Sequence, residues 1–195
     1  MKRALLVSLL CIGALNADVR QDIADSLWAA AYSSNIDVRV LYTIAKTESN
    51  FQPYIISFLT SDTDLIKKLK AGFKGSIYRF RSAKYNGSKY AVSISSSSKE
   101  AMLELAKFFW DFDFNIDFGL MQISKQNLKK DELELIFEPQ YNVSKSKEIL
   151  ALCAGRYSSA KDAIECYNKG FVAKKNYNYY ARFMNYFDSF FGEGK

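Results

Sequence analysis

The chain has 195 residues, a formal net charge of +6 and no histidine. One domain of this size can bury a full core, and the positive charge is too modest and too dispersed to indicate nucleic-acid binding. The absence of histidine excludes Ser-His-Asp and Cys-His nucleophiles, HExxH zinc proteases and histidine-ligated metal sites. If the chain is an enzyme, carboxyl groups must carry its proton transfers, and we expect neither a metal nor a cofactor.

The N-terminal residues have the pattern of a secretory signal peptide. Two basic residues precede an apolar run over 4–15, and Ala17 supplies a small residue before the predicted cleavage site. The run is too short for a permanent transmembrane helix. We therefore predict a signal peptide over 1–17, a single domain over 18–195, a periplasmic location and no stable membrane anchor after cleavage. A buried N-terminal helix is the alternative.

Helical periodicity dominates the predicted domain. Asp37 is a candidate N-cap for one helix, and Ser97 with Glu100 fits a capping box at the start of another. In chain order, the sequence predicts helices over 18–33, 38–49, 62–70, 98–110, 124–130, 139–154, 158–168 and 176–191.

A β-hairpin is predicted within this helical pattern. Two alternating segments, 77–84 and 89–95, flank Asn86-Gly87, a dipeptide that favours a two-residue hairpin turn. The pattern predicts an α+β domain that is mostly α, with residues 58–98 as an insertion. We expect this insertion to form a flap beside the functional cleft. Its basic residues make it the most basic stretch of the chain: Lys67, Lys68, Lys70, Lys74, Arg79, Arg81, Lys84 and Lys89.

The cysteine content predicts one disulfide. Cys11 lies in the predicted signal peptide, which leaves Cys153 and Cys166 as an even pair without CxxC spacing. In an oxidising compartment such a pair is typical of a structural disulfide. The two cysteines lie near the ends of successive predicted helices, so a short helical hairpin would bring them together. Two buried free thiols are the alternative.

Glu48 is a candidate proton donor on physical grounds alone. It lies in the last turn of the predicted helix 38–49, on the apolar face that includes Leu41 and Ala45. Partial burial and the negative end of the helix dipole both disfavour a charged carboxylate. We therefore expect a pKa raised toward the range in which a general acid works. A partly exposed glutamate at a helix end is the alternative.

Four segments, in order along the chain, resemble the signatures of the lysozyme-like soluble lytic transglycosylase (SLT) family. They are TESNFQP at 47–53, NIDFGLMQI at 115–123, EPQYNV at 138–143 and CYNKG at 166–170. Each segment alone is a weak signal, but the four together make a specific match over residues 38–182. The resemblance implies a lysozyme-like fold and cleavage of the glycan strands of peptidoglycan.

The resemblance also implies roles for individual residues. Glu48 matches the catalytic acid, and Ser57 matches the serine that binds the N-acetyl side of the substrate near the scissile bond. Asn142 matches a structural residue at a helix start. Met121 and Tyr167 are expected to supply flat apolar surface to the sugar. The full set expected to line the sugar cleft is Met121, Gln122, Tyr167 and Asn168.

The reaction that the resemblance implies needs only one carboxyl group. Glu48 would protonate the glycosidic oxygen and then, as a carboxylate, take the proton of the sugar's own C6 hydroxyl, which leaves a 1,6-anhydro-N-acetylmuramic acid end. Ordinary glycosidases use two carboxylates, and Asp111, Asp113 and Asp117 are candidates for a second one. A hydrolase is therefore an alternative. A non-catalytic wall-binding subunit is another, which would have no need for the full set of matched residues.

Two departures from the compact family pattern point to a subfamily. About 60 residues separate Ser57 from Gly119, and Asp117-Phe118 stands where Ala-Gly is usual before GLMQ. The aspartate, and the cysteine before the Tyr-Asn pair, resemble the small transglycosylases of type IV secretion and conjugation machines. This likeness implies local opening of the wall and, besides peptidoglycan, partner proteins of an envelope-spanning secretion system.

Overall fold

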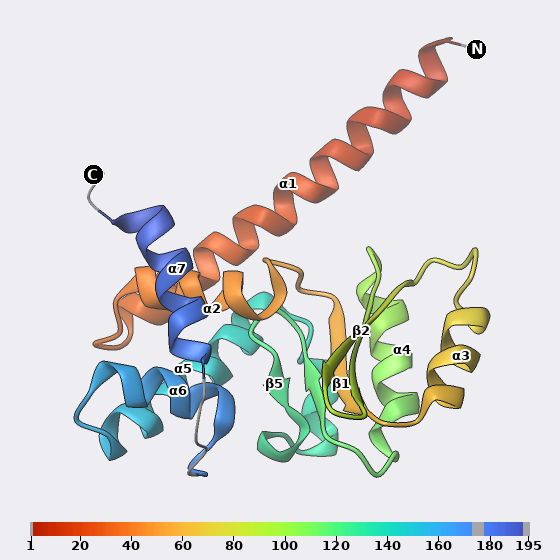
Figure 1. Cartoon of the computed structure of the whole chain (residues 1–195). Coiled ribbons are helices and arrows are strands. Elements are labelled where there is room, and N and C mark those ends of the chain that lie inside the picture. The colour runs from red at the N-terminus through yellow and green to blue at the C-terminus, as the bar shows by residue number, and fades with distance from the viewer. Residues whose placement is uncertain (1, 173–177, 193–195) are drawn as a thin grey trace.

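The computed structural model describes residues 2–172 and 178–192, with only the backbone described for 2–16. Figure 1 shows two halves: a bundle that contains α2, α5, α6 and α7, and a sheet with α3 and α4 beside it. The helices are α1 (Lys2–Tyr32), α2 (Val38–Ser49), α3 (Thr63–Gly72), α4 (Lys99–Trp110), α5 (Pro139–Arg156), α6 (Ala160–Lys169) and α7 (Tyr179–Phe191). The strands are β1 (Ile55–Thr60), β2 (Arg79–Asn86), β3 (Lys89–Ser95), β4 (Ile116–Phe118) and β5 (Ile123–Ser124). This is the expected α+β fold, mostly helical.

The N-terminal helix is longer than the sequence pattern predicts. It begins at Lys2 rather than near residue 18, so it runs through the predicted signal segment and projects away from the bundle in Figure 1. Cleavage after Ala17 stays a prediction. Among the described helices, none has both the length and the apolar content that crossing a bilayer requires.

Side-chain caps fix the starts of several helices. Asp37 accepts a hydrogen bond from the Arg39 amide at the start of α2, as predicted. At the start of α4 the N-cap is Ser98, which accepts from the Ala101 amide at 3.1 Å. The predicted capping box of Ser97 was therefore wrong by one residue.

The five strands form one antiparallel sheet in the order β2-β3-β1-β4-β5. The predicted hairpin of β2 and β3 is confirmed, but its turn falls on Gly87 and the following serine, because Asn86 pairs with Lys89. A bulge between Lys84 and Asn86 adds a residue to β2 and moves the turn one position along the chain. Three strands, β1, β4 and β5, were not predicted.

The helix predicted over 124–130 is absent. Ile123 and Ser124 pair with β4, so the backbone is still extended where that helix was expected to begin. The chain then continues in two short 3₁₀ helices, η1 (Lys125–Asn127) and η2 (Lys130–Glu134). Pairing with β4 has overridden the local helical pattern.

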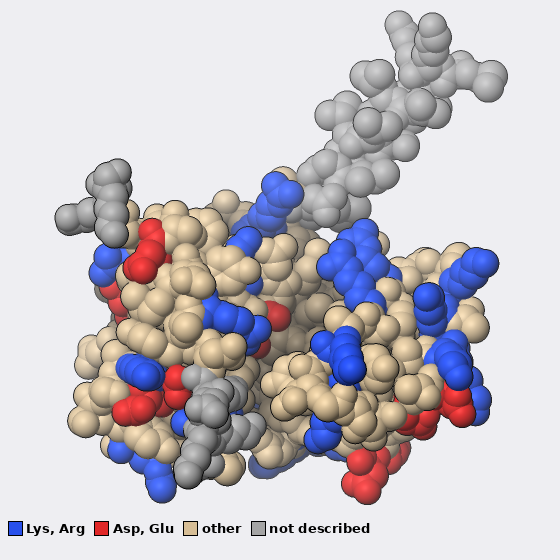
Figure 2. Space-filling model, in the orientation of Figure 1, with Lys and Arg blue, Asp and Glu red and all other residues tan. Residues whose placement is uncertain are grey.

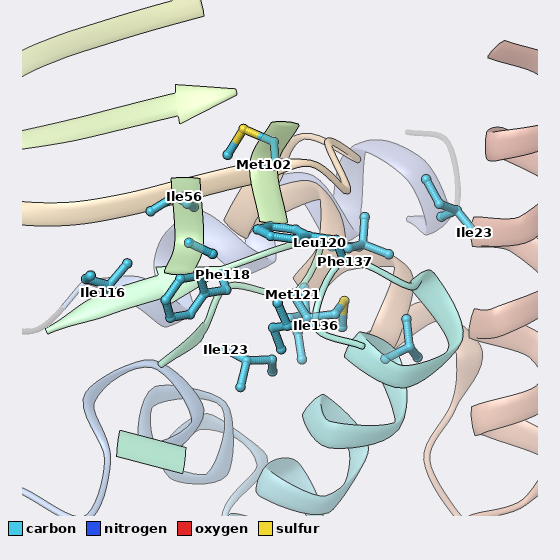
Figure 3. Packing of buried hydrophobic residues seen from close by; sticks show 14 of the residues in the cluster. Ile23, Ile56, Met102, Ile116, Phe118, Leu120, Met121, Ile123, Ile136 and Phe137 are labelled. Carbon is cyan, nitrogen blue, oxygen red and sulfur yellow. The ribbon is translucent and has the colours of Figure 1, made fainter. Parts of the chain in front are cut away.

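One face of the sheet belongs to the core. Ile56 and Phe58 of β1 and Ile94 of β3 are buried, as are Met102 and Phe109 of α4. Figure 3 shows Phe118, Leu120, Met121 and Ile123 packed in the same region as Ile136 and Phe137. The buried side chains of β1 and β3 alternate along the strands, which leaves the residues between them on the other face of the sheet.

The predicted disulfide is confirmed. It joins Cys153 of α5 to Cys166 of α6, with a Cα–Cα distance of 5.8 Å. Both cysteines are buried in a small cluster with Ala163, separate from the main core. The bond therefore fixes α6, which carries Tyr167 and Asn168, to the longer helix α5.

Candidate active site

The end of α2 sets the position of Glu48. Leu41, Ile44 and Ala45 of this helix are fully buried, and Glu48 lies in its last turn. The helix ends through two consecutive residues with positive φ, Asn50 and Phe51. Their amides bind the carbonyls of the last turn, which is a common way to stop a helix. The position of the Glu48 backbone is therefore fixed by the buried residues that precede it in α2 and by the hydrogen bonds that end the helix after it.

Two side chains from the C-terminal helices hold the Glu48 carboxyl group. The Tyr179 hydroxyl donates to Glu48 Oε1 at 2.5 Å, and the Asn168 amide donates to the same oxygen at 3.3 Å. Tyr179 is almost completely buried at the start of α7. Both bonds go to Oε1, and none of the hydrogen bonds among the described residues goes to Oε2.

The pKa of Glu48 is raised to about 7. Burial is the main cause, because it removes water from the charged form, and the negative charge of Asp117 adds to it. The hydrogen bonds from Tyr179 and Asn168 and the charge of Arg182 act in the opposite direction. Near neutral pH both protonation states of Glu48 are therefore populated, which suits a group that must give up a proton and take one back.

Asp117 is a second half-buried carboxyl group in this region. It lies on β4 and pairs with Ser57 of β1 and Ser124 of β5. Burial raises its pKa to about 6, and a hydrogen bond with Ser124 opposes that shift. The other two candidates are different: Asp111 is exposed and pairs with Lys130, and Asp113 is exposed. Of the three candidates, only Asp117 has a charge that acts on Glu48.

An open groove of about 700 Å³ extends from Ser57 and Asp117 over the outer face of the sheet. Arg81 and Lys70, both from the insertion 58–98, also line it. Residues of the segment 58–98 therefore line the same groove as Ser57 and Asp117, and its role as a flap stays a prediction. Figure 2 shows a hollow between the helical half and the sheet half, with basic side chains over the half that carries α3, β2 and β3. A larger hollow between α1 and the loop after α2 contains none of the side chains that contact Glu48.

The GLMQI segment forms the turn between β4 and β5. Gly119 has a φ of +75°, and a Cβ atom there would collide with the Asn142 side chain and lie 2.9 Å from the Ile136 carbonyl. Asn142 binds the Met121 amide at 2.7 Å and the carbonyls of Phe118 and Ile136 at 3.1 and 2.9 Å. Asn142, expected to be a structural residue at a helix start, lies in the first turn of α5, and its side chain fixes the GLMQI turn.

Of the residues predicted from the resemblance to line the cleft, Met121 is fully buried, whereas Gln122, Tyr167 and Asn168 have exposed surface. Met121 has no exposed surface, so its side chain cannot offer an apolar surface to a sugar, and this expectation is corrected. Its backbone carbonyl instead accepts a hydrogen bond from the Tyr167 hydroxyl at 2.7 Å. Gln122 is half-buried and donates to the Gly119 carbonyl at 2.9 Å. Asn168 is exposed and reaches Glu48, which places the Tyr-Asn pair at the site.

Tyr179 is the site residue that the sequence analysis missed. The predicted apolar stripe of the last helix includes Tyr180 and Phe183 but not Tyr179, which the structure buries in the main core beside Phe183. A buried tyrosine requires a partner for its hydroxyl, but the partner, Glu48, lies 131 residues away. No local sequence signal identifies that contact.

We expect Tyr179→Phe to lower roughly tenfold the rate of the glycan cleavage that the family resemblance implies, because a hydrogen bond to a charged group is lost. The bond lowers the pKa of Glu48, so its loss should raise that pKa further above 7 and move the alkaline limb of the pH–rate profile upward. Tyr180→Phe, at the neighbouring half-buried position, is the matched control. An unshifted limb in Tyr179→Phe would show that the hydrogen bond does not act on Glu48.

The fold and the site define a class of protein in which a glutamate with a raised pKa lies where a helical half meets a small sheet, near a second half-buried carboxyl group, Asp117. Comparison with known families agrees: the family model described as Transglycosylase SLT domain matches residues 26–189. The match covers most of the chain, including Glu48, the GLMQI turn and Tyr179. The chain therefore belongs to the SLT transglycosylase family, whose substrate is peptidoglycan. No curated protein and no solved structure gives a match.

Proposed function

We propose that the protein is a peptidoglycan lytic transglycosylase that cleaves the β-1,4 bond between N-acetylmuramic acid and N-acetylglucosamine and leaves 1,6-anhydro ends. The observation that carries the proposal is Glu48, a desolvated carboxyl group with a pKa of about 7. Tyr179 and Asn168 hold one of its oxygens.

The reaction proceeds with Glu48 in two protonation states. The protonated carboxyl group donates its proton to the glycosidic oxygen, so the bond from that oxygen to C1 of the muramic acid breaks. The resulting carboxylate then takes the proton of the C6 hydroxyl while the C6 oxygen bonds to C1. Glu48 ends as it began, protonated, and no water is consumed. A pKa near 7 makes both proton transfers accessible at neutral pH.

A second candidate is a hydrolase of the same bond, because Asp117 is a second half-buried carboxyl group. Its charge contributes to the raised pKa of Glu48, so the two groups interact. In a retaining glycosidase the second carboxylate is the nucleophile, and the product has a reducing end. In the transglycosylase reaction Asp117 has no covalent role and acts through its charge.

The products distinguish the two reactions. We expect mass spectrometry of digested peptidoglycan to show anhydro-muramic ends, and Asp117→Asn to retain activity within roughly tenfold of the wild type. Loss of the Asp117 charge should also lower the pKa of Glu48 and shift the alkaline limb to lower pH. Reducing ends, together with a loss of roughly 10²- to 10⁴-fold in Asp117→Asn, would instead establish the hydrolase.

We further propose that the protein is exported to the periplasm and opens the wall locally for a type IV secretion or conjugation machine. The N-terminal signal pattern supports export. The disulfide between Cys153 and Cys166 supports it too, because such bonds persist in oxidising compartments. The Asp117-Phe118 lead into GLMQI supports the subfamily, and with it partner proteins of the secretion system.

A further inference from the structure

A row of polar side chains crosses the outer face of the sheet. The strand register pairs Asp117 with Ser57, Ser57 with Ser93, and Ser93 with Arg81. Residues paired directly across antiparallel strands lie on the same face, so these four form one line. At a strand spacing of about 4.8 Å, the row is roughly 14 Å long, from Asp117 on β4 to Arg81 on β2.

The floor beside this row is open. Next to Arg81 and Ser93 on the same face, β2 and β3 carry the small residues Ala83 and Ala91, which pair with each other. These two alanines and the four residues of the row all line the groove of about 700 Å³. Leu59 of β1 also lines the groove and is 41% exposed, whereas Phe58 and Val92 are almost fully buried. The groove therefore runs along the row, with Asp117 at one end and β2 at the other.

The far end of the groove is basic. Arg81 and Lys70 line it and are both exposed. No acidic side chain in the described part of the chain forms an ion pair with either of them. In contrast, Lys67 of the same helix pairs with Asp64. Arg81 thus presents a guanidinium group to the groove with its donors available to a ligand.

We propose that Arg81, with Lys70, binds a carboxylate of the acidic stem peptide that peptidoglycan strands carry, so that the enzyme prefers strands whose stem peptides have free carboxylates. The inference rests on the proposed function. A neutral sugar needs hydroxyl and amide partners, which Ser57 and Ser93 supply along the row. A guanidinium group is suited to a carboxylate, which it binds through two parallel hydrogen bonds. On an intact strand the carboxylates belong to the stem peptides, which branch from the sugars.

The test compares initial rates on two substrates: intact peptidoglycan, and the same peptidoglycan after carbodiimide coupling to glycinamide has converted its peptide carboxylates to neutral amides. We expect the wild type to cut the untreated strands faster. Arg81→Ala should lower the ratio of the two rates roughly three- to tenfold, the size expected for an exposed charge pair with good geometry. Lys84→Ala removes a positive charge from the same strand but outside the groove, and it should keep the wild-type ratio.

Three outcomes would overturn the proposal. One is a wild-type ratio in Arg81→Ala. Another is an equal loss on both substrates by a variant whose thermal unfolding matches the wild type, because Arg81 would then serve the sugars. The third is weaker binding of Arg81→Ala to anionic phospholipid vesicles with an unchanged ratio, which would assign the basic end to a membrane surface. If the wild type cleaves neither substrate, the proposed function itself fails, and that result is distinct from all three.

Discussion

Glu48→Gln should lower the rate of glycan cleavage by at least the roughly 10²- to 10⁴-fold that a general acid–base group contributes. The amide keeps the shape of the side chain and can still accept the hydrogen bond from Tyr179. It cannot give up a proton and take it back, and in the proposed reaction one residue performs both transfers. The measurement is the release of soluble fragments from purified peptidoglycan. Glu104→Gln, an exposed glutamate on α4, is the matched control and should cleave like the wild type.

The same variant should be more stable than the wild type at alkaline pH. The pKa of Glu48 is 4.5 as a reference value and about 7 in the folded protein. The folded state thus holds its proton more tightly than the unfolded state. The wild type therefore loses stability as the pH rises from about 4.5 through 7, and the glutamine variant does not. At pH 8 the difference should be roughly 3 kcal/mol in the variant's favour, and below pH 4.5 it should vanish.

Thermal unfolding at pH 4 and pH 8 measures this difference and also shows whether the variant is folded. A variant that unfolds as predicted but does not cleave establishes Glu48 as the chemical group. Substantial cleavage by the variant would show that the proton donor is another residue. An equal melting temperature for wild type and variant at both pH values would show that the Glu48 carboxyl group is not desolvated.

The parts of the fold that the sequence predicts well depend on local signals. The Asp37 cap and the apolar spacing placed α2 correctly, and with it Glu48 at the helix end. Turn chemistry near Gly87 placed the hairpin to within one residue. In each case residues close together in the chain determine the structure, so a pattern of a few residues is enough.

The parts that the sequence did not predict depend on distant contacts. β1, β4 and β5 exist because they pair with one another and with β3, and the short β5 replaced a predicted helix. The packing of Met121 is decided by Asn142, 21 positions further along, which fixes its backbone and directs its side chain into the core. The family resemblance correctly identified the GLMQI segment. It assigned the contact to the Met121 side chain, whereas the backbone carbonyl of Met121 makes a contact, with Tyr167. Only folding brings α7 against α2, and so Tyr179 to Glu48.

Loss of the disulfide should have the second largest effect, on stability rather than on chemistry. Cys153 and Cys166 are 13 positions apart, and a cross-link that closes a loop of this size stabilises a folded domain by about 3 kcal/mol. We expect the variant with both cysteines replaced by serine to unfold at lower urea concentration by a corresponding amount. Activity should fall as well near the unfolding transition, because Tyr167 and Asn168 follow Cys166 on α6 and Asn168 contacts Glu48.

Reduction of the wild type provides the control for this variant. Dithiothreitol breaks the bond without placing a hydroxyl group in the small buried cluster around Ala163. The reduced wild type and the double serine variant should therefore share most of the loss, and any excess in the variant measures the cost of burying the two hydroxyl groups. If reduction leaves the urea midpoint unchanged while free-thiol titration detects both cysteines, α6 is held by its packing on α5 alone. The bond would then contribute nothing to the wall of the site.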